Sequence, residues 1–176
     1  MNHRLSAAIL ATIRPIPDHP TVGIVFQDIT PVLADSLLLR QVIEEMTVPF
    51  LSAGVTHILG IEARGFILGA PVAAWMGAGF IPARKPGKLP WKTMREDYTL
   101  EYGTDALEAH QDAIPGRARV LVVDDVLATG GTARAAGALV QRLGGELVGW
   151  AFLLQIAALR GRRQLAGAPV HVLASR

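Results

Sequence analysis

The 176-residue sequence contains no cysteine, and this absence excludes several kinds of site at once. Without thiols there is no disulfide framework, no thiolate zinc site and no catalytic cysteine. The five histidines are scattered along the chain, so the sequence indicates no transition-metal site. Charged residues are also few, at 18% against 51% hydrophobic residues, and this balance predicts a compact folded domain and not a disordered chain.

A large excess of charge of one sign is absent as well. The formal net charge of +2 is too small to indicate nucleic-acid binding, and we expect no nucleic-acid partner. Residues 66–83 carry no charge and are long enough to span a bilayer. Glycines and prolines interrupt them, however, so we predict a buried helix followed by a buried strand. Residues 1–12 predict an amphipathic helix and not a signal peptide; we expect no membrane partner and a cytoplasmic protein.

Apolar runs alternate with helical patterns along the chain. Short apolar runs predict buried strands at residues 57–61, 79–83, 120–123, 147–154 and 170–173. Helical spacing predicts helices at residues 35–52 and 132–143, and a basic helix at 159–165. Residues 15–31 and 91–97 are interpreted as irregular, and residues 98–103 as a hairpin strand. The alternation predicts an α/β domain: a parallel sheet flanked by helices on both faces, with ligands at the carboxyl ends of the strands.

Residues 119–132 carry the most informative pattern, Arg-Val-Leu-Val-Val-Asp-Asp-Val-Leu-Ala-Thr-Gly-Gly-Thr. Asp124 and Asp125 follow where the buried strand emerges, and residues 128–132 lead into a helix. A glycine pair lets the backbone aim several N–H groups at one point, and such donors at a helix N-terminus suit a phosphate. The two acids would repel that phosphate unless they bind another part of the same ligand. Ribose hydroxyls are the natural candidate.

Other interpretations of this stretch stay open on the pattern alone. Glycine pairs also end strands without binding anything, Thr132 can be a simple helix N-cap, and acids at a strand exit are often just solvated. The stretch is not a Walker A loop, because no Gly-Lys-Ser/Thr follows. It also lacks the Gly-x-Gly-x-x-Gly spacing of dinucleotide-binding loops.

An apolar strand, paired acids and Thr-Gly-Gly-Thr together resemble the phosphoribosyl pyrophosphate (PRPP) loop of type I phosphoribosyltransferases. The resemblance implies the type I phosphoribosyltransferase fold. It also implies that Asp124 and Asp125 bind the ribose. The 5′-phosphate would then be bound by the loop that follows, which consists of Ala128, Thr129, Gly130, Gly131 and Thr132.

Two segments with cations follow predicted strands: Gly-Ile-Glu-Ala-Arg-Gly-Phe at residues 60–66 and Arg-Lys-Pro-Gly-Lys-Leu-Pro at residues 84–90. On charge alone, each is equally consistent with a solvated surface segment. Both resemble pyrophosphate-binding segments of adenine phosphoribosyltransferases. The resemblance implies a cis peptide between residues 62 and 63. It further implies that four cations face the pyrophosphate, namely Arg64, Arg84, Lys85 and Lys88.

Residues 23–30 form a loop whose Phe26 can stack on a planar ring, although the sequence alone favours a loop whose Val25 and Phe26 fill a core. In adenine phosphoribosyltransferases the similar segment covers the purine site, and its main chain reads adenine. The resemblance implies an adenine site formed by Val25, Phe26, Gln27 and Leu127. Gln27 stands where arginine is common in the family. Leu-Glu-Tyr-Gly at residues 100–103 is also similar, which implies Glu101 as the general acid/base.

By this resemblance, adenine and PRPP would give AMP and pyrophosphate in purine salvage. Mg²⁺ would be held mainly by the substrate, without a direct protein ligand, and the protein would be a homodimer. Residues 1–176 would form one domain, with an N-terminal hood at about residues 1–34 and a mobile hairpin lid at about residues 88–106.

Two rival functions remain. A transferase for another base, such as xanthine or guanine, is disfavoured by residues 84–90 and 100–103. A ligand-sensing regulator on the same fold would need neither Glu101 nor the basic loop at residues 84–90. A structural protein without a ligand is the reading least consistent with these motifs.

Overall fold

The computed structural model describes residues 2–100 and 103–176. The first elements are α1 (His3–Thr12), β1 (Arg14–Ile16), β2 (Phe26–Asp28), α2 (Thr30–Ala34), α3 (Ser36–Thr47) and the 3₁₀ turn η1 (Val48–Phe50). They are followed by β3 (His57–Ile61), α4 (Arg64–Met76), β4 (Gly79–Ala83), β5 (Thr93–Leu100), β6 (Gly103–His110) and β7 (Arg119–Leu127). The last are α5 (Gly131–Arg142), β8 (Glu146–Gln155), the 3₁₀ turns η2 (Ala157–Leu159) and η3 (Gly161–Gln164), and β9 (Val170–Ser175).

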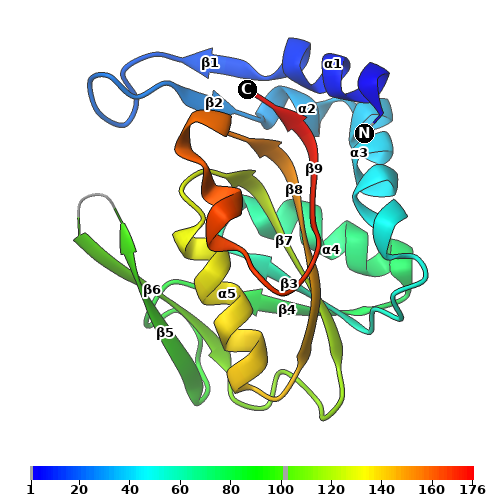
Figure 1. Cartoon of the computed structure of the whole chain (residues 1–176), viewed down its shortest axis with the longest axis vertical. Helices are drawn as coiled ribbons and strands as arrows, with labels where there is room; N and C mark the ends of the chain where they lie inside the picture. Colours follow the sequence, from blue (N-terminus) through cyan, green and yellow to red (C-terminus); the bar gives the residue numbers. More distant parts are fainter. Residues whose placement is uncertain (1, 101–102) are drawn as a thin grey trace.

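A parallel sheet lies at the centre of the molecule (Figure 1). In the part of the chain that the structure describes, its five strands lie in the order β4-β3-β7-β8-β9, and every neighbouring pair is parallel. Helix α5 packs on one face, whereas α4, α3 and α1 lie on the other. The predicted α/β class, with helices on both faces of a parallel sheet, is confirmed.

The alternation of side chains along β7 explains why this sheet needs cover on both faces. Leu121 and Val123 belong to the core that contains α1, α3 and α4, whereas Val120 and Val122 belong to the core beneath α5. All four side chains are fully buried. A strand that is apolar on both sides is typical of a parallel sheet covered twice.

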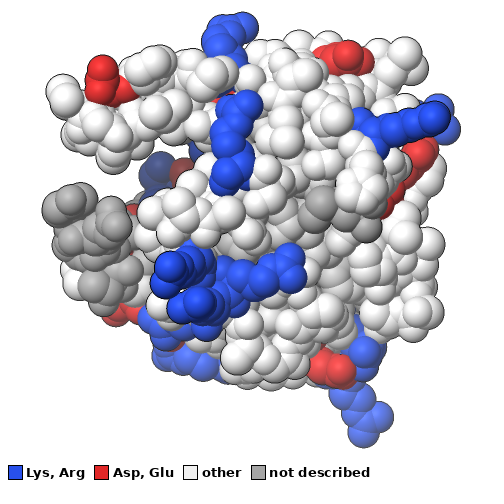
Figure 2. Space-filling model, turned by 45° about the horizontal axis from the view of Figure 1, so that its top comes forward, with Lys and Arg blue, Asp and Glu red and all other residues white. Residues whose placement is uncertain are grey.

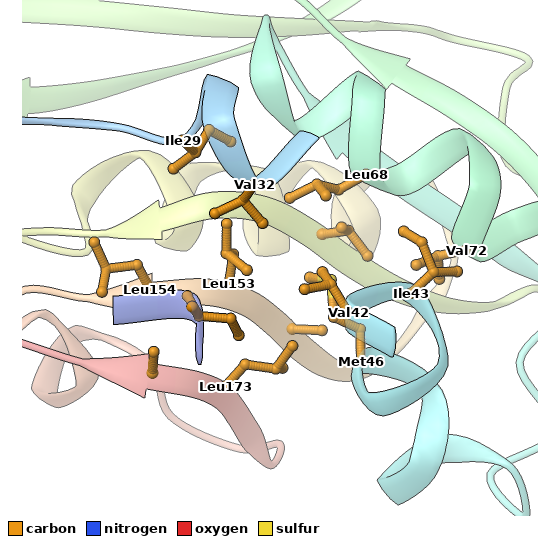
Figure 3. Packing of buried hydrophobic residues seen from close by; sticks show 14 of the residues in the cluster. Ile29, Val32, Val42, Ile43, Met46, Leu68, Val72, Leu153, Leu154 and Leu173 are labelled. Atoms are coloured by element: carbon orange, nitrogen blue, oxygen red, sulfur yellow. The ribbon is translucent and has the colours of Figure 1, made fainter. Parts of the chain in front are cut away.

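Helix α3 shows how local signals and burial agree. Asp35 caps it, because its carboxylate accepts hydrogen bonds from the backbone N–H groups of Leu37 and Leu38 at 3.0 Å. Val42 and Met46, four residues apart, point into the core and meet side chains from the sheet and from α4 (Figure 3). The helical spacing seen in the sequence therefore marks the face that is buried.

Outside the central sheet lie two antiparallel pairs of strands. β1 pairs with β2, and these strands gather with α1 and α2 at the top of Figure 1. β5 pairs with β6 in a hairpin that projects to one side. None of the helices in the described ranges is long and apolar enough to cross a membrane.

Three sequence-based predictions of local structure are wrong. Residues 15–31 are not wholly irregular, because β1 and β2 pair across an intervening loop and α2 begins at Thr30. Residues 93–97 belong to β5, whose polar side chains are tolerated in a two-stranded ribbon. Residues 159–165 do not form one helix: Arg160 adopts φ 53° and separates η2 from η3.

Candidate functional site

A cavity of about 1040 Å³ opens at the carboxyl ends of β3 and β7. The chain runs from β3 outward to β4 and then returns to the other side of β3 as β7, so the direction of winding reverses between these strands. Ligands bind at such a reversal in open α/β sheets. In Figure 2 the surface is hollowed beneath the lobe at the upper left, and basic and acidic atoms are visible inside the hollow.

One wall of the cavity comes from the loop and strand at residues 23–27. The ring of Phe26 stands edge-on to the ring of His19, with centroids 5.2 Å apart. The guanidinium carbon of Arg64 lies 5.0 Å from the centroid of the Phe26 ring. This cation–π contact joins the N-terminal wall to the residues that follow β3.

At the end of β3, the Glu62–Ala63 peptide is cis, as the sequence resemblance predicted. The Glu62 carboxylate accepts hydrogen bonds from the Lys88 ammonium at 2.7 Å, the Lys85 backbone N–H at 2.9 Å and the Arg84 guanidinium at 3.4 Å. Burial alone would raise the pKa of Glu62, but these three donors lower it to about 2. Glu62 is therefore ionised at neutral pH and gathers the cations of the segment after β4.

At the end of β7, two adjacent carboxyl groups face the same cavity in different environments. Asp125 is 5% exposed, and its carboxylate is paired with the Arg64 guanidinium. Asp124 accepts a hydrogen bond from the backbone N–H of Asp125 at 2.9 Å. Withdrawal from solvent raises the pKa of Asp124 well above its ordinary value, and the negative charge of Asp125 raises it further. Ionisation of Asp124 beside the negative charge of Asp125 is therefore unfavourable.

The loop between β7 and α5 closes the floor of the cavity, and Ala128 and Thr132 line it. Gly130 adopts φ +88°, a conformation that side chains disfavour, and a methyl group there would lie 2.4 Å from the carbonyl oxygen of Gly161. Helix α5 begins at the next residue. The N–H groups at the start of a helix have no intrahelical acceptor, so this floor suits an anion.

Lys85 connects the cavity to the β5–β6 hairpin. Its ammonium donates a hydrogen bond to the Tyr98 hydroxyl at 2.7 Å and is paired with Asp105, both residues of the hairpin. Burial alone would lower the pKa of Lys85, but Asp105 and Tyr98 raise it above the ordinary value. The lysine stays charged at neutral pH, and the hairpin is tied to the edge of the binding cavity.

The comparisons with known proteins agree with this geometry. The family model described as "Phosphoribosyl transferase domain" matches residues 38–167. The adenine phosphoribosyltransferase of Myxococcus xanthus is 57% identical, over 96% of this chain and 92% of that protein. The crystal structure of adenine phosphoribosyltransferase from Rhodothermus marinus is 50% identical, has a TM-score of 0.96, and covers 99% of this chain and 100% of that one.

The chain belongs to the adenine phosphoribosyltransferase family. A more distant member from Saccharomyces cerevisiae is 35% identical with a TM-score of 0.91, covering 97% of this chain and 99% of that one. That structure holds an imino-altritol bisphosphate together with adenine.

The cavity brings together predicted site residues from all four motifs that mark the adenine phosphoribosyltransferase family in the described chain. They line it as three groups: Val25, Phe26 and Gln27; Arg64 and Lys85; and Asp124, Asp125, Ala128 and Thr132. Segments separated by up to about a hundred residues therefore meet at one sheet edge, as expected for strand ends. The roles of these residues stay predictions.

Some predicted site residues of the family lie elsewhere. Leu127 is 1% exposed and packs in the core beneath α5, while its neighbour Val126 lines the cavity. Arg84 and Lys88 are not among the residues that line the cavity, but both pair with Glu62, which does line it. The loop at residues 128–132 lines the cavity at both of its ends, and the residues between them are Thr129, Gly130 and Gly131. Glu101 lies outside the described residues.

Sequence reasoning missed several groups that take part in the site. Glu62 stood inside a recognised segment, yet its bonds to two cations and one backbone N–H need the spatial approach of the segment after β4. Ile156 and Leu159 line an apolar side of the cavity, and Arg176 lines it from the end of β9. No local pattern in the sequence signals these contacts, because each depends on packing between distant segments.

Proposed function

We propose that this protein transfers the phosphoribosyl group of PRPP to adenine, giving AMP and pyrophosphate, in purine salvage. The observation that carries the proposal is the composition of one cavity. An acidic pair, a glycine loop at a helix N-terminus and two cations meet opposite an aromatic wall, in a chain of the adenine phosphoribosyltransferase family. These parts match the sugar, 5′-phosphate, pyrophosphate and base of the two substrates.

The floor of the cavity is assigned to the phosphoribosyl group. The loop at residues 128–132 would hold the 5′-phosphate through backbone N–H groups at the start of α5, where the helix dipole also favours an anion. Asp124 and Asp125 would then orient the ribose hydroxyls, which can donate hydrogen bonds to carboxylate oxygens. Fixing both ends of the sugar presents its C1′ atom to the base.

The pyrophosphate is assigned to the end of β3 and the segment after β4. Each of the four predicted cations already has a carboxylate partner: Arg64 pairs with Asp125, Lys85 with Asp105, and Arg84 and Lys88 with Glu62. Pyrophosphate would compete for these cations as it binds. During the reaction the cations would offset the charge that builds on the departing pyrophosphate.

Adenine is assigned to the wall formed by residues 25–27. Phe26 would stack on the purine, the main chain of Val25 and Gln27 would read its polar edge, and Ile156 and Leu159 supply apolar surface to the same cavity. Leu127 would contribute through its backbone and its place beneath the loop. Glu101 is proposed to exchange a proton with the imidazole ring of the purine.

Mg²⁺ is proposed to bind with PRPP. No group of three histidine or acidic residues within residues 2–100 and 103–176 is arranged to hold a metal ion. The phosphates and hydroxyls of PRPP would hold the ion, without a direct protein ligand, because Mg²⁺ in such sites is commonly held through substrate phosphates. When bound, the ion would neutralise part of the pyrophosphate charge.

The wider organisation is also a proposal. We infer one domain over residues 1–176, a hood at about residues 1–34 that covers the base, and a lid at about residues 88–106 that excludes water during the reaction. A cytoplasmic homodimer is the assembly and location that the family resemblance favours.

Product analysis tests the proposed reaction. Purified protein with adenine, PRPP and Mg²⁺ is expected to form AMP and pyrophosphate in equal amounts, and chelation of Mg²⁺ is expected to slow the reaction. Binding of PRPP without formation of AMP would contradict the proposal and favour a ligand-sensing role.

A further inference from the structure

Arg176 reaches the adenine side of the cavity from a distant part of the sequence. Its Nη1 atom donates a hydrogen bond to Oε1 of Gln27 at 2.6 Å, and its Nη2 atom donates to the carbonyl of Leu10 at 3.2 Å. The backbone of Arg176 is fixed too: its N–H donates to the Gln155 carbonyl at 2.9 Å, and its carbonyl accepts from the Ala157 N–H at 2.8 Å. These bonds fix the backbone from which the Arg176 side chain extends.

The contact with Arg176 determines which way the Gln27 amide points. A guanidinium has donors only, so Gln27 must turn its oxygen toward Arg176 and its nitrogen away. Nε2 of Gln27 then donates to the carbonyl of Val25 at 3.1 Å. Gln27 is only 9% exposed, so water competes little for either bond. The hydrogen bonds thus form a chain in which Arg176 donates to Gln27 and Gln27 donates to the Val25 carbonyl.

We propose that Arg176 is a positioning residue for base recognition, which acts through Gln27 on the carbonyl of Val25. This inference rests on the proposed binding of adenine at residues 25–27. A carbonyl has two lone pairs, and Gln27 occupies one of them. The other accepts a hydrogen bond from the 6-amino group of adenine. A 6-oxopurine presents an acceptor at the same place, which leaves its own O6 atom and the second lone pair of the Val25 carbonyl without a donor and is disfavoured.

Substitution of Arg176 tests the chain of hydrogen bonds. Arg176→Met keeps an unbranched side chain but removes every donor, and Arg176→Lys keeps a charged donor group on a single nitrogen. Arg163→Met is the matched control, because Arg163 is an exposed arginine of η3. For each variant, kcat, the KM for adenine and the KM for PRPP are measured, together with the melting temperature.

For Arg176→Met we expect the KM for adenine to rise about tenfold, the effect of losing one charge-assisted hydrogen bond. The KM for PRPP is expected to change less than about twofold, because the phosphate loop is a separate segment. Arg176→Lys should recover part of the adenine affinity, and Arg163→Met should leave all three constants unchanged. A purely structural role would instead lower the melting temperature and shift both KM values together, which would overturn the proposal.

A second variant keeps the test decisive. Gln27→Leu removes the middle of the chain, so adding Arg176→Met to it should raise the KM for adenine no further. Additive effects of the two substitutions would overturn the proposal. Failure of the unmodified protein to form AMP would overturn the proposed function itself, whereas normal activity with an unchanged adenine KM in Arg176→Met would overturn only the role of Arg176.

Discussion

Gly161 supports the phosphate loop from outside the sequence motif, and its substitution gives a sharp test. A methyl group at residue 161 would lie 2.1 Å from the carbonyl oxygen of Ala128 and 2.9 Å from the backbone nitrogen of Gly130. Both atoms belong to the loop that we assign to the 5′-phosphate. Backbone atoms cannot swing aside as a side chain can, so Gly161→Ala must displace the loop, the η3 turn, or both.

The size of the effect follows from the cost of overpacking. Forcing a methyl group into a filled contact costs about 1–3 kcal/mol. About 1.4 kcal/mol of that strain at the phosphate loop weakens binding tenfold. We therefore expect the KM for PRPP to rise about fivefold or more in Gly161→Ala. The KM for adenine should change by less than about threefold, because residues 25–27 form a different wall.

The assay is steady-state kinetics at saturating adenine with PRPP varied, preceded by circular dichroism to establish that the variant is folded. Gly116→Ala is the matched control: a methyl group there would meet none of the described atoms within 4 Å. A folded Gly161→Ala protein with the PRPP KM of the Gly116→Ala protein would refute the reasoning. It would mean that the loop at residues 128–132 does not need its present position to bind PRPP.

Further substitutions test the charged groups of the cavity. Asp124→Asn should lower turnover sharply, yet unfold at a higher temperature than the unmodified protein at pH 7. The raised pKa of Asp124 makes its ionisation in the folded state unfavourable, so this advantage should shrink to nothing as the pH falls below about 4. Glu62→Gln should lose about 1–2 kcal/mol in urea unfolding at pH 7, after allowance for solvent screening, whereas the surface control Glu146→Gln should lose less than about 1 kcal/mol. Because the pKa of Glu62 is lowered to about 2, its contribution should disappear as the pH falls from about 4.5 to 2, and a constant difference across that range would contradict the ion-pair assignment. Glu101→Gln should lower kcat more than it weakens adenine binding, and the opposite pattern would assign Glu101 to recognition.

Much of the central sheet can be predicted from the sequence because its signals are local. The apolar runs at residues 57–61 and 79–83 coincide with β3 and β4, since strands buried on both faces need continuous apolar sequence. The helix after residue 130 follows from a glycine pair and apolar spacing. These elements also place the ends of β3, β4 and β7 at one edge of the sheet, which is why the cavity was predictable in outline.

The contacts that complete the site are not encoded locally. β1 and β2 each contain three residues, which is too short for a clear sequence pattern. They are strands because they pair with each other, with Pro15 opposite Gln27 at the centre of the pairing. Leu127 shares a motif with Asp125 but does not line the cavity with it. Its side chain packs instead in the core beneath α5. The bond between Arg176 and Gln27 spans 149 positions, so no sequence spacing could indicate it.

Base selectivity tests the central claim most directly. Purified protein is mixed with PRPP and Mg²⁺ and, in separate reactions, with adenine, hypoxanthine, guanine or xanthine, while nucleotide formation is followed. The proposed assignment of residues 25–27 predicts AMP from adenine and no comparable product from the three 6-oxopurines. Efficient formation of a nucleotide from a 6-oxopurine instead of adenine would contradict the account of how this wall recognises its base.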